Sequence, residues 1–188
     1  MTYYGGKDLA QAFRTVRNNT IEIAKDIPED EYDFTASPDT RSVRDMLVHI
    51  ALANVFANEV HRKKISDLTK INWPEVVERV NAEQAKRRTK AEIISLLEED
   101  AADFAGFLEG LDDAFLGEML TMFPGATPDV KSRFEMLLGV KEHEMHHRAQ
   151  LMLIERMLGI VPHLTRQREE RMAQMQAARA QQTAAKPL

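Results

Sequence analysis

Apolar residues recur three, four or seven positions apart along most of this chain, with charged and amide side chains between them. Such spacing places the apolar side chains on one face of a helix. In the first part of the chain, Leu9, Phe13 and Val16 follow it and predict an amphipathic helix over about residues 7–27, which Pro28 ends.

Further helices are predicted from the same spacing and from capping residues. Thr89 followed by Glu92 is a capping box, and Thr127 before Pro128 is typical of a helix start. We expect helices over about residues 40–61, 74–86, 89–110 and 128–158, with connections over about residues 28–40, 62–73 and 111–126. No segment alternates polar with β-branched residues, so we expect no sheet.

The predicted fold class is all-α. Four long amphipathic helices in one domain favour a four-helix bundle, with the short helix over 74–86 as an addition between main helices two and three. We assign residues 1–163 to this domain and residues 164–188 to a polar, basic extension. The extension is predicted to continue as a helix to about Ala178 and then to fray.

Composition narrows the class of protein. With 188 residues, of which 44% are hydrophobic and 29% charged, the chain is typical of a soluble globular domain. It has no long apolar run and no signal-peptide pattern, so we expect a cytoplasmic protein without membrane association. The formal net charge of −5 argues against a nucleic-acid partner. Because there are no cysteines, a metal site would use His, Asp or Glu.

Histidines gather in the last main helix. At about 100° per residue, His147 lies near the centre of an apolar stripe and His143 slightly to one side. His146 lies roughly 60° further out, so it is the poorer candidate. In the second main helix, His49 shares a face with Met46 and is also expected to point inward. His49, His143 and His147 could therefore bind one divalent ion and leave a position for water or substrate.

The same stretch admits other interpretations. His143 to His147 matches the H-E-x-x-H pattern of zinc metalloproteases, in which Glu144 would be the base, but the longer downstream pattern is missing. A di-iron site is disfavoured because Glu144 and His147 form only one Glu-x-x-His pair. Asp45 is an alternative proton acceptor or a partner of His49. His61 and His163 lie at or beyond predicted helix ends, and we assign both to the surface.

Taken together, these motifs resemble the DinB/YfiT-like family of four-helix-bundle metal proteins. The resemblance rests on His49 within Val43–Ile50 and on the stretch His143–Leu151, and it spans residues 5 to about 163. Matched position by position, it implies that His49, His143 and His147 bind the metal, which would be zinc or nickel. It also implies a small-molecule substrate and is compatible with a homodimer.

The chemistry remains open between three hypotheses. Some proteins that the chain resembles are thiol-dependent transferases or isomerases using a low-molecular-weight thiol such as bacillithiol or mycothiol, and we favour this type as the expected function. The second hypothesis is a metal-dependent hydrolase that uses metal-bound water. The third is a metal-bound stress-response module without catalysis. The sequence identifies no catalytic side chain.

Overall fold

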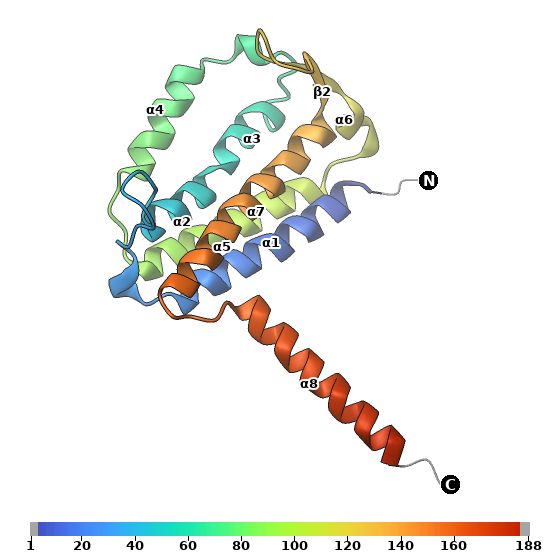
Figure 1. Ribbon diagram of the computed structural model, residues 1–188. Coiled ribbons are helices and arrows are strands. Elements are labelled where there is room, and N and C mark those ends of the chain that lie inside the picture. The colour runs from blue at the N-terminus through green and yellow to red at the C-terminus, as the bar shows by residue number, and fades with distance from the viewer. Residues whose placement is uncertain (1–3, 185–188) are drawn as a thin grey trace.

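The computed structural model describes residues 4–184, in which long helices lie side by side (Figure 1). The bundle consists of α1 (Gly6–Asp26), the consecutive helices α2 (Val43–Leu52) and α3 (Asn54–His61), α5 (Lys90–Glu109) and α7 (Arg133–Met157). Both α1 and α2 contact α5 and α7. Helix α1 and the consecutive pair α2–α3 therefore lie at opposite corners of the bundle, with α5 and α7 between them. The predicted all-α four-helix bundle is confirmed.

Side-chain caps fix where the bundle helices begin. Thr89 accepts a hydrogen bond from the backbone N–H of Glu92, whose carboxylate accepts one from Thr89 N at 2.7 Å, which confirms the predicted capping box. Ser42 caps α2 by accepting a hydrogen bond from the backbone N–H of Asp45. The cap predicted at Thr127 is wrong, because Ser132 caps α7 instead.

The segment before α7 contains a small sheet, which contradicts the expectation of none. After the short helix α6 (Asp113–Gly117), strands β1 (Met119–Thr121) and β2 (Val130–Ser132) pair antiparallel, with Met119 opposite Ser132. Three residues are too few for an alternating pattern to stand out in the sequence. The hairpin holds residues 119–132 across one end of the bundle, beside the first turn of α7.

Apolar side chains fill the bundle along its length. Near one end, the rings of Phe13 and Phe104 pack edge to face with centroids 5.1 Å apart. Here α1 approaches the end of α5 closely, since a Cβ on Gly6 would lie 2.5 Å from the carbonyl oxygen of Leu108. Towards the other end the core is aliphatic, with Ile23, Leu47, Ile93, Leu97 and Leu151 all fully buried.

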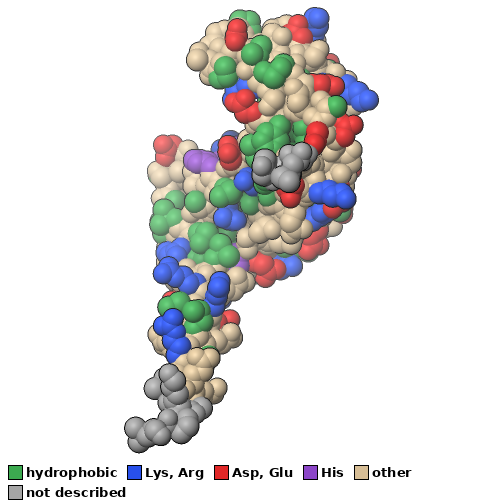
Figure 2. All heavy atoms as spheres, turned by 90° about the vertical axis from the view of Figure 1, so that its right-hand side faces the viewer, with side chains coloured by type: hydrophobic (Ala, Val, Ile, Leu, Met, Phe, Trp, Pro, Cys, Tyr) green, Lys and Arg blue, Asp and Glu red, His purple; other side chains and the backbone are tan. Residues whose placement is uncertain are grey.

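Besides the short helix α6, two further α-helices of the described part of the chain lie outside the four-helix core. The predicted short helix is α4 (Trp73–Gln84), which packs against α2 and α3. At the C-terminal end, α8 (His163–Ala184) projects away from the bundle and extends beyond the predicted end at Ala178 (Figure 1). Figure 2 shows Lys and Arg side chains gathered near its base. None of the helices that the structure describes is long and apolar enough to cross a membrane.

Candidate metal centre

Three histidines from two facing helices meet inside the bundle. His49 lies in the last turn of α2, and His143 and His147 lie one turn apart on α7. The Nε2 atom of His143 is 3.1 Å from that of His49 and 3.2 Å from that of His147. These are the three residues that the helical angle selects from the sequence.

Their spacing fits a divalent ion. Nitrogen ligands about 2.0–2.1 Å from a tetrahedral zinc ion lie roughly 3.3 Å from each other, which is close to the observed separations. The three ligand atoms lie within 4.8 Å of one another, and no other group of three His, Asp or Glu residues in the described part of the chain is so arranged. His146 is exposed and lies outside this group.

The imidazoles are held in the neutral form that a metal requires. Burial lowers the pKa of all three, that of His49 to about 4, and the charge of Arg41 lowers each further. In addition, Nδ1 of His147 lies 2.8 Å from Oε1 of Gln150. Because this amide oxygen only accepts hydrogen bonds, the proton is assigned to Nδ1, which leaves the Nε2 lone pair free.

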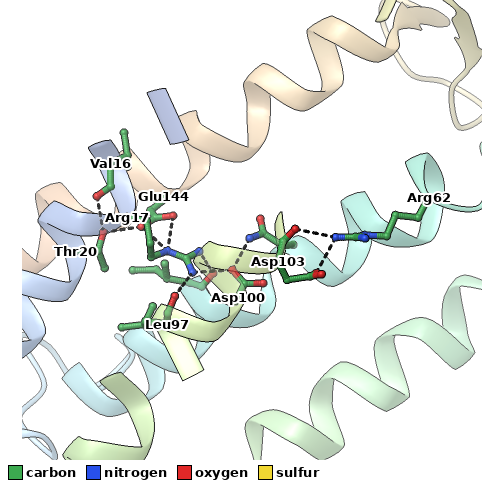
Figure 3. A network of polar contacts seen from close by, with 10 residues as sticks. Val16, Arg17, Thr20, Arg62, Leu97, Asp100, Asp103 and Glu144 are labelled. Atoms are coloured by element: carbon green, nitrogen blue, oxygen red, sulfur yellow. Dashed lines mark hydrogen bonds and ion pairs between the residues drawn. The ribbon is translucent and has the colours of Figure 1, made fainter. Parts of the chain in front are cut away.

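Glu144, the candidate base of the protease interpretation, is hydrogen-bonded to Arg17 and Thr20 of α1. Both of its carboxylate oxygens accept from Nε of Arg17, at 2.9 and 3.1 Å, and Oε1 also accepts from Oγ1 of Thr20 at 2.7 Å (Figure 3). Its exposed fraction is 2%, and that of Arg17 is 0%. Glu144 is thus a buried partner of Arg17, and the structure gives no support to the role of a base that the protease interpretation assigns to it.

Arg17, on α1, forms hydrogen bonds with residues of the other three corners of the bundle, α2, α5 and α7. Its Nη1 donates to Asp100 at 2.6 Å and to the Leu97 carbonyl on α5, and its Nη2 donates to the Ile50 carbonyl on α2. Burial raises the pKa of Asp100, and contact with Arg17 offsets part of this effect. Asn54 also donates to Asp100 at 2.6 Å. The network therefore includes Glu144, the residue that follows His143 on α7, and the carbonyl of Ile50, the residue that follows His49 on α2.

Asp45, the other acid considered beside the histidines, belongs to a helix cap. Its Oδ2 accepts a hydrogen bond from Oγ of Ser42 at 2.8 Å in the first turn of α2. This is the position in which an acid stabilises the positive end of a helix. Asp45 and Glu144 thus each have a structural partner, Ser42 and Arg17, respectively.

A cavity of about 890 Å³ adjoins the histidines. It follows α2 and α3 from His49 to His61, a rise of roughly 18 Å at 1.5 Å per residue. Its walls are mostly apolar and include several aromatic rings, and His49, His143 and Arg41 also line it. The other lining residues include Leu52, Phe56, Val60, Leu68, Trp73, Val80, Asn81, Gln84, Met122, Phe123, Met136, Gly139 and Val140.

The cavity walls come in part from segments outside the four main helices. Of the connections 28–40 and 111–126, the second supplies Met122 and Phe123. The first supplies none, and its place is taken by Arg41 and by α4, whose Trp73 stacks on Phe56 with centroids 6.1 Å apart. The short helix thus forms a wall of the cavity.

Two histidines assigned to the surface are buried. His61 is 1% exposed, and Nη1 of the buried Arg133 lies 3.4 Å from its Nδ1. Burial lowers its pKa to about 4. His163 is 3% exposed, and its Nε2 lies 3.0 Å from Oδ1 of Asn19. Both assignments were wrong because other segments of the chain cover these helix ends.

The profile of the DinB superfamily matches residues 12–151. No curated protein matches the chain.

Several solved structures share the fold. The DinB-like protein YjoA from Bacillus subtilis is 20% identical, with a TM-score of 0.60 over 80% of this chain and 92% of that protein. YfiT from the same organism, described as a probable metal-dependent hydrolase with an unusual four-helix bundle topology, is 14% identical, with a TM-score of 0.64 over 85% and 91%. A DinB-like protein from Bacillus cereus is 16% identical, with a TM-score of 0.64 over 86% and 97%.

Proposed function

The chain belongs to the DinB superfamily, and from this premise we propose that it is an enzyme whose divalent metal ion is bound by His49, His143 and His147. The observation that carries the proposal is the convergence of three neutral imidazoles, of which those of His49 and His143 line a large apolar cavity. Three protein ligands leave a coordination position for a reactant, as in catalytic rather than structural zinc sites.

We further propose that the reaction is transfer of a low-molecular-weight thiol to an electrophilic small molecule. A bound divalent ion lowers the pKa of a thiol or water beside it and so supplies a nucleophile near neutral pH. Neither Asp nor Glu lines the cavity among the described residues, and Glu144 is held by Arg17. A thiol that ionises directly needs no carboxylate as general base, whereas hydrolysis commonly uses one.

The remaining residues position and shield the reactants. Gln150 holds the ring of His147 through Nδ1, and the aromatic walls of the cavity exclude water from an apolar substrate. Hydrolysis is the second candidate, because the structurally similar YfiT is described as a probable metal-dependent hydrolase.

Metal content tests the centre itself. Purified protein should contain about one zinc or nickel ion per chain by elemental analysis, and His147→Ala should lose it. His146→Ala is the matched control, because His146 is on the same helix but exposed and outside the group of three. Equal metal content in wild type and His147→Ala would contradict the proposed centre.

Product formation then separates the reactions. Conjugation of an aromatic electrophile only when a small thiol is added would support thiol transfer, whereas cleavage of a nitrophenyl ester without thiol would support hydrolysis. Metal-loaded protein that does neither, but melts at lower temperature after chelation, would instead support a structural role for the metal.

A further inference from the structure

Arg41 is the one cationic side chain in the lining of the described cavity, which it shares with His49 and His143. It precedes the Ser42 cap of α2. Every other Arg or Lys of the described chain lies outside the cavity lining. Arg41 therefore defines the charge of this part of the cavity.

Arg41 is exposed, and its guanidinium forms no hydrogen bond or ion pair within the described structure. Its neighbour Arg44, in contrast, pairs with Asp33 at 2.9 Å. Its charge nevertheless reaches the site, since it lowers the pKa of His49, His143 and His147. With neither Asp nor Glu in the lining of the described cavity, this charge is not neutralised by the cavity walls.

The rest of the cavity suits an apolar body. Between His49 and His61 the walls are aliphatic and aromatic, with Phe56, Trp73 and Phe123 in mutual contact. Pockets of this kind bind through apolar area and obtain specificity from a few placed polar groups. Guanidinium groups pair with carboxylates through two parallel hydrogen bonds, a geometry that one arginine can offer to one ligand carboxylate.

We propose that this cavity takes an amphiphilic anion, whose apolar acyl or aryl body lies along α3 and whose carboxylate binds Arg41 beside the three histidines. Arg41 is then the residue that selects charged over uncharged substrates. This inference rests on the proposed function for the claim that the ligand is a substrate, but the binding itself does not require metal.

The test is ligand binding to metal-free protein, so that no ion competes for the carboxylate. Calorimetric titration with hexanoate, octanoate and decanoate should show affinity rising about fourfold with each added methylene, since each buries further apolar surface. Decanol, which has the same chain without the charge, should bind at least tenfold more weakly than decanoate.

Variants at Arg41 then identify the anion site. Arg41→Ala should weaken decanoate binding at least tenfold and leave decanol binding unchanged, whereas Arg41→Lys should lose less because it retains the charge. Arg87→Ala is the matched control, since Arg87 is exposed, lies outside the cavity lining and carries the same charge. It should bind decanoate as wild type does.

Each contrary result overturns the inference. Equal binding of decanol and decanoate to wild type would show that the cavity does not select anions. Unchanged decanoate binding in Arg41→Ala, with the variant melting as wild type does, would remove Arg41 from the site. Because these measurements use metal-free protein, their failure is distinct from failure of the proposed metal centre, which is read from metal content.

Discussion

Replacement of Glu144 by Gln distinguishes a structural acid from a general base. The substitution keeps the size of the side chain but removes its charge and one acceptor oxygen. In the protein, both oxygens accept from Nε of Arg17 and one also accepts from Thr20. In either orientation of the new amide, its NH₂ group replaces an oxygen that accepted from Nε of Arg17. Two donors then face each other, and that hydrogen bond is lost.

The expected loss of stability follows from this geometry. A buried hydrogen bond to a charged group is worth about 1.5–3 kcal/mol, and Arg17 keeps Asp100 as a second anionic partner at 2.6 Å. We therefore expect Glu144→Gln to lower the free energy of unfolding by about 2–3 kcal/mol, below the cost of an entirely unpaired buried charge. For a chain of this size, the melting temperature should fall by about 4–12 °C.

Thermal unfolding by circular dichroism and elemental analysis measure the two effects separately. Glu144→Gln should melt lower but keep its metal content and its activity per folded molecule. Glu142→Gln, an exposed substitution two residues away, should change neither. The reasoning would be refuted by a variant that melts within about 1 °C of wild type yet loses metal or turnover, because Glu144 would then act at the centre.

Three further outcomes are expected. Saturating metal should raise the unfolding free energy by about 2.7 kcal/mol at a hundred times the dissociation constant, measured by thermal unfolding across a zinc titration, and His147→Ala should show no rise. Burial raises the pKa of Glu155 from 4.5 to about 7, so the folded state binds this proton more tightly than the unfolded state. The stability of wild type relative to Glu155→Gln should therefore fall by roughly 2–3 kcal/mol as pH rises from about 4.5 to about 7, and a pH series of urea titrations with no such trend would contradict it. Gly6→Ala should destabilise the protein, because its Cβ would lie 2.5 Å from two backbone oxygens. Gly106→Ala should stabilise it by about 0.5–1 kcal/mol, because Gly106 is at an exposed position of α5 with open space around its Cβ; urea unfolding of both variants measures the difference.

The sequence predicts the parts of this protein that depend on helical periodicity. The bundle follows from apolar spacing, and His49, His143 and His147 follow from the angle at which each leaves its helix. Capping residues predict the start of α5 well, because the Thr89–Glu92 box is a local interaction. These features can be predicted without knowing which helices pack against each other.

What the sequence does not reveal depends on contacts between distant segments. Arg17 lies four residues after Phe13 on the buried face of α1, so the helical angle alone would have placed it inside. Its partners, however, come from other helices. His61 is likewise buried by segments that pack on the end of α3. The role of α4 as a cavity wall also depends on tertiary packing, which periodicity does not encode.

The position of Arg17 has a consequence for how the chain folds. Its partners on α2, α5 and α7 lie between 33 and 127 residues away along the chain. An intermediate that had docked three helices without α7 would bury this guanidinium while Glu144 was still absent, which is costly. Partly assembled bundles are therefore penalised relative to both the unfolded and the complete states. This penalty favours a cooperative, two-state transition in which the four helices dock together.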